Sequence, residues 1–359
     1  MNNSSEYSVF LNNEAVRVFA WVIALIGLPL NVFLIGLMIW ESWSANYSKK
    51  RRNFHTQNPT ILKSPSLWLL FNLFICDLFA SIYIFILAIS DSYYIYYYKN
   101  IYHFNTSSSL VKNVWFKSSA CVTAHFFAKV TISIAGTLTL VMAIDRFLLI
   151  VRPHSKWKFT MKVSQIITAV IWIVDFSFVS GMAVSHFNSI SRISSYTFRF
   201  DLNLCLGDFD SLIFHRILSY LELGYYLLAY VVSLILYLLI IRKLRISRLT
   251  FGSQTSSTCE RRFQIMFTLI ACTNAFGFFF IMISTIATNP NAERSTFQNM
   301  VNLFLFANSA IDPILYLIFR RNDIKKQLYC GRIYNTVIEP ASQSKTRQTD
   351  QVGLMEIQK

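Results

Sequence analysis

The stretch CVTAHFFAKVTISIAGTLTLVMAIDRFLLIV, at residues 121–151, decides the fold. Between Val122 and Val151 it contains only three charged residues, which are Lys129, Asp145 and Arg146. A helix needs about 20 mainly apolar residues to cross the hydrocarbon core of a bilayer. The stretch therefore predicts a membrane-spanning helix, and it places charged groups where burial in lipid is costly.

Six other stretches pass the same test of length and apolar content. They are Val18–Trp40, Leu67–Ile89, Ile166–Val184, Ile217–Ile241, Phe263–Ala287 and Val301–Phe319. The composition agrees, because 54% of the 359 residues are hydrophobic and only 14% are charged, whereas soluble domains carry about 25% charged residues. We expect an all-α membrane protein, a bundle of seven transmembrane helices, and not a cytosolic globular protein.

The positions of Lys and Arg predict how the chain crosses the membrane. With the N-terminus outside, the inner segments hold 24 of the 33 basic residues and the outer segments hold 8. Cytoplasmic loops of membrane proteins carry such an excess of Lys and Arg. We therefore expect the N-terminus outside and the C-terminus inside. We attribute the net charge of +15 to topology and to contact with anionic membrane lipid, not to nucleic-acid binding.

The segments outside the spans predict a short outer N-terminus and a longer inner tail. We expect an extracellular segment at 1–17, a membrane domain at 18–319, a short amphipathic eighth helix at 320–330 and a disordered cytoplasmic tail at 331–359. Sequons that begin at Asn2, Asn3 and Asn105 fall on predicted outer surfaces and predict N-glycosylation. Six Cys residues do not make a disulfide scaffold, but they allow one specific bridge.

Ionisable residues inside membrane spans are candidates for function because they are costly to bury there. In this chain they are Asp77, Lys129, Asp145, Arg146, Asp175, Glu222 and Asp312. The motifs around them are Gly27 and Asn31 in the first span, Asn72-Leu73 before Asp77, Asp145-Arg146-Phe147, Trp172, Tyr237, and Asn308-Ser309 before Asp312-Pro313-Ile314-Leu315-Tyr316. In their order and separations, these motifs resemble the signature of rhodopsin-like (class A) G-protein-coupled receptors across about residues 18–330.

The resemblance implies a plasma-membrane receptor with a conformational switch at the inner end of the bundle. The expected members of the switch are Asp145, Arg146, Phe147, Tyr237, Glu260, Asp312, Pro313 and Tyr316. Arg146 would pair with Asp145, and Glu260 is a second candidate partner. When the foot of the sixth span moves outward, Arg146 would be freed to meet a heterotrimeric G protein, with Tyr237 and Tyr316 turned inward to support it.

The resemblance also implies two covalent features and one ion site. A disulfide between Cys121 and Cys205 would tie the second outer loop over the mouth of the bundle, and Cys330 is a candidate for palmitoylation. The candidate sodium ligands are Asp77, Asn308, Ser309 and Asp312. A cation would neutralise the two carboxylates, or one of them would be protonated. The usual third-helix Ser of this site is Ala135 here, and no other cofactor is expected.

Departures from the family pattern narrow the ligand. Ala128 stands where amine receptors carry an Asp, and Thr296–Phe319 lacks the Schiff-base Lys of an opsin. The sixth span lacks the family's Trp and Pro, and Phe276 or Phe278 would take the place of that Trp.

The ligand pocket is expected near Lys129, whose ammonium needs an acidic partner inside the membrane. Glu222 and Asp175 are the two candidates for that partner. We expect His125, Lys129, Glu222 and Phe276 to bind a peptide or a small polar molecule from outside the cell. The alternative is that Lys129 belongs to an internal structural ion pair.

Other classes of function fit the sequence less well. A transporter or channel predicts internal repeats and polar residues along a pore, and neither occurs in the sequence. A membrane enzyme needs a catalytic set such as His-Glu-x-x-His on one helix, and the six His residues form no such spacing. Among receptors, Trp115 and Asp91 give the first outer loop a weak similarity to the membrane domain of glycoprotein-hormone and relaxin-type receptors.

Overall fold

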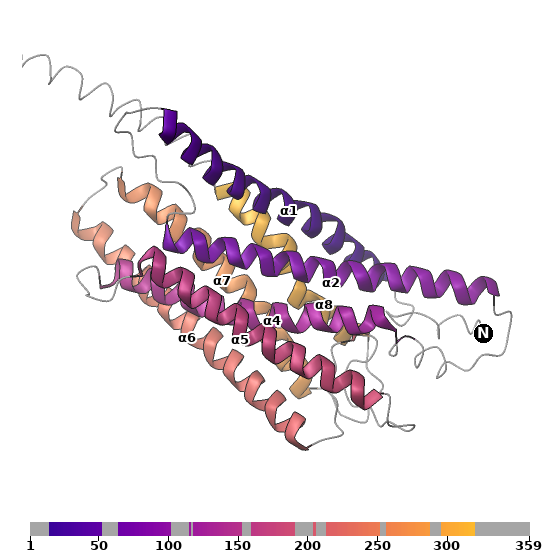
Figure 1. Cartoon of the computed structure of the whole chain (residues 1–359). Helices are drawn as coiled ribbons and strands as arrows, with labels where there is room; N and C mark the ends of the chain where they lie inside the picture. The colour runs from indigo at the N-terminus through magenta and orange to yellow at the C-terminus, as the bar shows by residue number, and fades with distance from the viewer. Residues whose placement is uncertain are drawn as a thin grey trace, which may run out of the picture.

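The computed structural model describes residues 14–51, 64–101, 115, 118–152, 159–190, 204–205, 213–251, 256–287 and 296–319. Within these ranges the chain forms α-helices and no β-strand. The helices are α1 (Glu14–Arg51), α2 (Pro65–Ile101), α4 (Ser119–Ile150), α5 (Met161–Ile190), α6 (Ile213–Phe251), α7 (Ser256–Ala287) and α8 (Thr296–Phe306), followed by the helical segment Asn308–Phe319. They form one elongated bundle (Figure 1).

The expected bundle of seven membrane helices is confirmed. Five helices are each long and apolar enough to cross a bilayer, and α8 with Asn308–Phe319 makes a bent sixth span. The described part of α7 adds the shorter apolar segment Gln264–Phe280. Most helices run beyond the predicted ends, as α2 does through the tyrosine-rich run to Ile101. Hydropathy marks the part of a helix that lies in lipid, and it does not mark where the helix ends.

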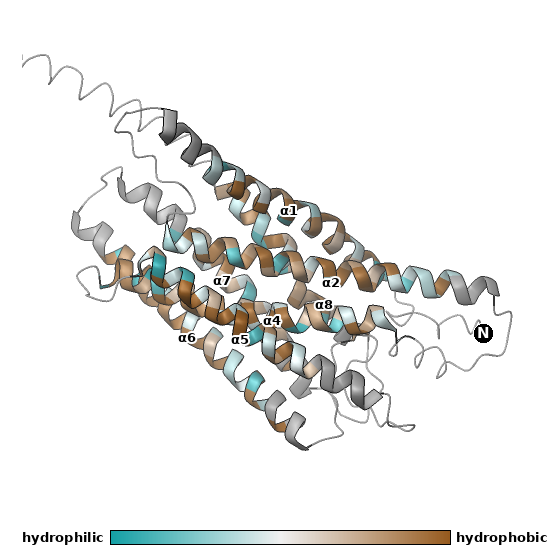
Figure 2. Ribbon diagram, in the orientation of Figure 1, coloured by the Kyte–Doolittle hydropathy of each residue, from teal (hydrophilic) through white to brown (hydrophobic). Residues whose placement is uncertain are grey.

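The outer surface of the bundle is apolar, as lipid contact requires. Apolar residues cover much of the helices (Figure 2), and large apolar side chains such as Leu25, Ile173 and Leu228 are more than 60% exposed. In water, an apolar surface of this extent would drive association. In a membrane it faces lipid tails.

The α4 helix lies at the centre, with α2, α5 and α6 packed against it. Buried side chains of α4 such as Ile134 and Leu138 join one apolar core with Phe74 of α2 and Tyr237 of α6. Trp172 of α5 packs against the same core, and its indole Nε1 donates to Asn72 Oδ1 of α2 at 3.0 Å. The central position of α4 brings its polar residues next to several helices at once.

The seventh span bends by 40° between α8 and Asn308–Phe319, although the sequence predicted one continuous span. Beyond the bend, Pro313 has no N–H and leaves the carbonyl of Ser309 without its helical partner. Asn31 of α1 supplies that partner, because its Nδ2 donates to the Ser309 carbonyl oxygen at 2.7 Å. The Ser309 carbonyl is therefore hydrogen-bonded, although Pro313 cannot donate to it.

The contact between α1 and the seventh span needs a glycine at position 27. A Cβ atom at Gly27 would lie 2.6 Å from the Ser81 hydroxyl oxygen and 3.2 Å from the Ser309 carbonyl oxygen. Any side chain here would push α1 away from both neighbours. Gly27 thus allows the approach that the Asn31 hydrogen bond requires.

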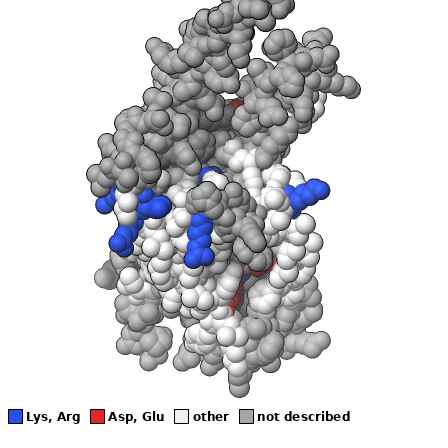
Figure 3. Space-filling model, turned by 90° about the vertical axis from the view of Figure 1, so that its left-hand side faces the viewer, with Lys and Arg blue, Asp and Glu red and all other residues white. Residues whose placement is uncertain are grey.

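Basic side chains gather at one end of the bundle (Figure 3). Among the described residues they are Arg146 and Arg152 at and after the end of α4, Lys162 at the start of α5, and Arg242, Lys243 and Arg245 near the end of α6. This is the end that the charge distribution in the sequence predicts to be cytoplasmic.

Several predicted segments lie outside the described residues. They are most of the N-terminal segment 1–17, the expected amphipathic helix at 320–330 and the tail at 331–359, together with the modification sites Asn2, Asn3, Asn105 and Cys330. Within the segment 1–17, α1 already begins at Glu14.

Candidate functional site

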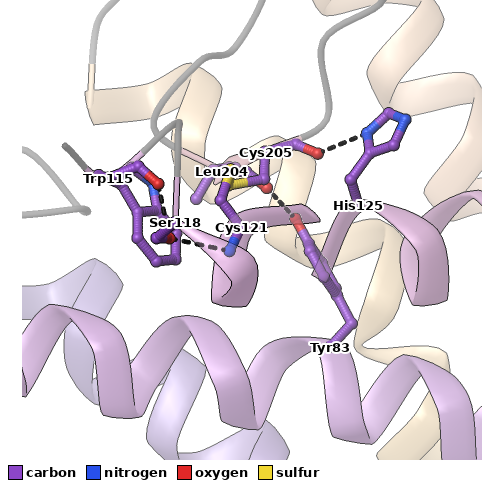
Figure 4. The surroundings of a disulfide bond; sticks show 7 residues. All are labelled: Tyr83, Trp115, Ser118, Cys121, His125, Leu204 and Cys205. Carbon is purple, nitrogen blue, oxygen red and sulfur yellow. Dashed lines mark hydrogen bonds between the residues drawn. A yellow bond between two sulfur atoms is a disulfide. The ribbon is translucent and has the colours of Figure 1, made fainter. Parts of the chain in front are cut away.

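A disulfide joins Cys121, at the start of α4, to Cys205 (Figure 4). The two Cα atoms lie 5.6 Å apart across a sequence separation of 84 residues. The pairing expected from the receptor signature is therefore confirmed. Both cysteines are buried, so the bridge fixes one point of the loop before α6 against the start of α4.

Two side chains hold the same loop dipeptide, Leu204-Cys205, by its backbone. The Tyr83 hydroxyl of α2 donates to the Leu204 carbonyl oxygen at 2.8 Å. His125 Nδ1 of α4 lies 2.8 Å from the Cys205 carbonyl oxygen, which only accepts, so Nδ1 is the protonated nitrogen. Leu204 is fully buried, and Cys205 has a φ of 52°. Three attachments thus fix this dipeptide over the start of α4.

An ion pair joins α1 and α2 on the same side of the molecule. Arg17 Nε donates to Asp91 Oδ2 at 2.7 Å, with the Asp91 side chain fully buried. Next to it, Tyr94 of α2 packs edge-on against Trp115, with ring centroids 5.6 Å apart. These contacts give Asp91 and Trp115 a structural place at the end of the bundle where α1 begins.

A polar stripe runs along α4, formed by Lys129, Ser133 and Thr137 at intervals of four residues. Such intervals place side chains on one face of a helix. Lys129 Nζ lies 3.5 Å from Glu222 Oε2 of α6, and Ser133 donates to the carboxylate of Asp175 in α5. Of the two partners left open by the sequence, the ion pair with Lys129 is formed by Glu222.

Glu222 has a second partner on its own helix. The Tyr226 hydroxyl donates to Glu222 Oε1 at 2.9 Å. Lys129 and Glu222 are only 17% and 14% exposed. The charged pair is therefore largely buried, and its carboxylate is held by groups from two helices.

Phe276 lies apart from this polar group, contrary to the expectation from the sequence. Its side chain is 59% exposed and packs on Phe280, whereas Phe278 is 3% exposed and packs against Tyr226 and Tyr230. Two residues correspond to about 200° of turn in an α-helix, so the two rings point to nearly opposite sides. Of these two rings, Phe278 points into the bundle.

Two carboxylates are buried in the middle of the bundle, as the sequence predicted. Asp312 accepts hydrogen bonds from Thr273 Oγ1 at 3.1 Å and from Asn274 Nδ2 at 2.9 Å. Asp77 is 3% exposed, and its Oδ2 has no hydrogen-bond partner in the described part of the chain. Asn308 donates to Asn274 Oδ1 at 3.3 Å. Both carboxylates therefore lack a basic partner among the described ion pairs.

The Ser309 hydroxyl makes a hydrogen bond within its own helical span. Its Oγ donates to the Phe306 carbonyl oxygen at 2.8 Å, and its carbonyl accepts from Asn31. A hydroxyl oxygen retains lone pairs after donating, so Ser309 can still serve as an oxygen ligand.

Arg146, near the C-terminal end of α4, makes contacts with an acidic and an aromatic side chain. Its Nε lies 4.0 Å from Asp145 Oδ2, and its guanidinium carbon lies 4.2 Å from the ring centroid of Phe267 in α7. Asp145 also accepts a hydrogen bond from Ser66 at the start of α2. A cation above an aromatic face is attracted by about 0.5–2 kcal/mol. The arrangement connects α4 to α2 and to α7.

The two tyrosines expected in the switch are both buried. The Tyr237 hydroxyl has no hydrogen-bond partner within the described residues. The Tyr316 ring packs edge-on against Phe74 of α2, with centroids 5.3 Å apart. Phe147 is half-buried and packs against the same core. Glu260 belongs to α7, but its side chain lies outside the described part, so its pairing with Arg146 remains a prediction.

Four residues near the site had no signal in the sequence. Ser66 and Phe267 contact Asp145 and Arg146 from other helices, and Tyr83 binds the carbonyl of Leu204 beside Cys205. Gln264 of α7 is 1% exposed, and neither of its amide atoms has a hydrogen-bond partner among the described residues. Each has a common residue type, and only the packing of the bundle places it. Among the described residues no group of three His, Cys, Asp or Glu side chains could hold a metal ion.

Comparison with known families agrees with this geometry. The model of the 7 transmembrane receptor (rhodopsin family) matches residues 55–316. The match covers most of the chain and includes the motifs in α2, α4 and the seventh span. No curated protein matches the chain.

Proposed function

This chain belongs to the rhodopsin family of seven-transmembrane receptors, and we propose that it transmits the binding of an extracellular ligand to heterotrimeric G proteins. As a member of that family it is a multi-pass receptor of the plasma membrane. We also propose that its N-terminus lies outside. The basic side chains gather at the end of the bundle that lies away from the start of α1, and an excess of Lys and Arg is typical of the cytoplasmic side.

The observation that carries this proposal is the restraint of Arg146 by Phe267. Arg146 lies over a ring of α7, at 4.2 Å, so a displacement of α7 would remove the contact. The freed guanidinium could then meet a G protein at the inner surface, while the buried Tyr237 offers a hydroxyl that has no hydrogen-bond partner among the described residues. A restrained and a freed state of Arg146 are the two states that a ligand must bias.

We place the ligand-binding end on the same helix, at Lys129. It lies 17 residues before Arg146, which corresponds to roughly 25 Å at the rise of an α-helix. The pair of Lys129 and Glu222 is largely buried and offers one charge of each sign. We propose that it binds a peptide or a small polar molecule that carries both charges, with His125 above the pair and Phe278 of α7 in the role first expected of Phe276.

Binding at this pair would reach α7 through α6. Glu222 is bonded to Tyr226, and the Tyr226 ring packs edge-on against Phe278 with centroids 6.3 Å apart. A ligand that draws Glu222 away from Lys129 would therefore shift the packing between α6 and α7. This route supports coupling to the Arg146 contact on the inner half of α7.

We propose in addition that sodium binds near Asp77 and Asp312, with Asn308 and Ser309 as neighbouring ligands. The support is chemical, since two buried carboxylates face a cost of burial that a cation would reduce. Asp77 Oδ2 is unpaired in the described part and is the oxygen most available for this role. Ala135 offers no oxygen at the position of the usual serine.

The test of the proposed function is a signalling screen on the full chain. Cells that express it are exposed to peptide and metabolite libraries and read for second messengers. The proposal predicts an agonist whose response disappears in Arg146→Ala while binding persists, because Arg146 lies far from Lys129. A variant that binds the agonist and signals fully would contradict the role of Arg146.

A further inference from the structure

An acidic side chain lies within a lipid-facing span. Asp175 belongs to α5, which is the least buried of the five helices that are each long enough to cross a bilayer, and it is itself only half-buried. Its neighbours Ile173, Val174 and Phe176 are 66%, 59% and 40% exposed. Asp175 lies about 21 Å along the helix from Met161 and about 10 Å from Met182, the ends of the span. The carboxylate is thus well inside the hydrocarbon region.

Among the described residues, Asp175 has one hydrogen-bond partner and no basic partner. Ser133 donates to its Oδ1, and the ammonium of Lys129 is paired with Glu222. No ion pair joins Asp175 to a basic residue in the part of the chain that the structure describes. Carboxylates inside a membrane usually pair with a cation or line a functional site, because they are costly to bury alone.

The polar stripe of α4 continues from Ser133 to the surface of the bundle. One turn further, the Thr137 hydroxyl lies 3.0 Å from the Tyr225 hydroxyl of α6, in an exposed position. Tyr225 is 44% exposed, and a Cβ atom added at the adjacent Gly224 would meet no atom within 4 Å. Polar groups of α4, α5 and α6 are therefore accessible from the lipid side, where no water is present to bind them.

We infer that Asp175, Ser133, Thr137 and Tyr225 form a binding site, open to the bilayer, for the amine head of a single-chain cationic amphiphile. The ammonium pairs with Asp175 and supplies the missing positive charge. The hydroxyls of Thr137 and Tyr225 accept its remaining hydrogen bonds. The alkyl chain lies on the apolar surface of α5, where Phe176 and Phe178 are exposed.

The charge of the site and its location in the membrane determine which class of ligand it fits. Asp175, Glu222 and Lys129 together carry an excess of one negative charge when ionised, which favours a cation over an anion or a neutral lipid. A ligand that reaches an exposed side chain of a lipid-facing helix must itself partition into lipid. Both conditions are met by a long-chain amine. The site shares no residue with the proposed pocket of Lys129, Glu222 and His125.

Photolabelling of the full chain in phosphatidylcholine nanodiscs tests the site. The probe is octadecylamine that carries a diazirine and an alkyne in its chain. We expect labelled peptides from α5 and α6, competed by excess octadecylamine and not by octadecanol. Asp175→Asn should lower the competed labelling by about tenfold or more, since a hydrogen bond to a charged group contributes about 1.5–3 kcal/mol. Ser133→Ala should lower it to a smaller extent.

Two controls keep the result specific. Ser177→Ala changes an exposed residue two positions along α5 and should leave labelling unchanged. Arg146→Ala should also keep labelling while it abolishes signalling, so failure of the amphiphile site and failure of the proposed receptor function give different results. Thermal unfolding of each variant shows whether it is folded.

Three outcomes would overturn the inference. The first is equal competed labelling of the parent and a folded Asp175→Asn variant. The second is equal competition by octadecanol, which would mean that the surface binds alkyl chains without regard to charge. The third is a chain-to-chain adduct at the same peptides in place of lipid labelling, which would show that a second copy of the protein covers Asp175. If Asp175→Asn does not fold, unchanged labelling in Ser133→Ala decides against the site.

Discussion

Asn31 donates a hydrogen bond from its Nδ2 to the backbone carbonyl oxygen of Ser309 at 2.7 Å. Ser309 lies four residues before Pro313, and the missing N–H of Pro313 is the reason that this carbonyl is available. Asn31 also donates to the Gly27 carbonyl at 2.9 Å. A side chain of α1 therefore completes the backbone of the seventh span, and the two motifs that contain Asn31 and Pro313 act as one unit.

Asn31→Ala should lower the thermal unfolding midpoint of the purified chain, because an unpaired buried carbonyl costs about 1–3 kcal/mol. Pro313→Ala supplies an N–H for the Ser309 carbonyl. Asn31→Ala should therefore destabilise the Pro313→Ala background less than it destabilises the parent. Additive effects of the two changes in this double-mutant cycle would mean that the residues act independently.

The number of spans could be predicted from sequence because each needs a long apolar stretch, which is a local property. The sequence also led to the pairing of Cys121 with Cys205, which the structure contains. The bend after α8 was missed because Pro313 alone does not show whether another helix supplies a donor. Phe276 was chosen over Phe278 without knowledge of the rotation of α7. Helix rotation is fixed by packing, which one sequence does not record.

Loss of the loop attachments should act separately from loss of the disulfide. Mass spectrometry of unreduced peptides should find Cys121 joined to Cys205, and recovery of both as free thiols would contradict the structure. Tyr83→Phe removes the hydroxyl that binds the Leu204 carbonyl and keeps the ring. We expect the bridge to persist in this variant while its rate of reduction by a mild thiol rises severalfold, because one of three attachments is lost. An unchanged rate would show that the hydroxyl does not restrain the loop.

Lys129→Gln and Glu222→Gln distinguish a ligand site from a structural ion pair. Each removes one of the two charges that the ligand would meet, so each should reduce the potency of an identified agonist by about tenfold or more. In the ligand-site interpretation both variants reach the cell surface at the parent level. The double variant restores neutrality at the pair. If both single variants are retained inside the cell and the double variant reaches the surface normally, Lys129 and Glu222 form a structural ion pair.

Phe267 should restrain signalling in the absence of ligand. Phe267→Leu keeps an apolar side chain in the core of α7 and removes the aromatic face over which Arg146 lies. Since a cation–π contact contributes about 0.5–2 kcal/mol, we expect basal second-messenger production to rise by about threefold or more. Phe276→Leu is the matched control, because Phe276 lies on the exposed side of the same helix. Equal basal activity of the two variants would remove Phe267 from the switch.

Gln264 gives the sharpest test of whether the structure represents the restrained state of Arg146. It lies one turn before Phe267 on α7, it is 1% exposed, and neither amide atom has a hydrogen-bond partner in the described residues. A buried polar group without a partner costs about 1–3 kcal/mol. The restrained state of Arg146 therefore contains a polar group that would gain by moving to water or to a partner when α7 is displaced. Gln264→Leu removes this cost at similar volume.

The expected result for Gln264→Leu is a higher thermal unfolding midpoint together with lower basal and agonist-stimulated signalling. Both changes follow if the substitution stabilises the restrained state and not the freed one. Ile265→Leu, at the neighbouring and partly exposed position, controls for a general effect of the substitution on α7. A lower midpoint in Gln264→Leu would mean that the amide is satisfied in the folded protein. A higher midpoint with unchanged signalling would mean that Gln264 is equally buried in both states and does not take part in the switch.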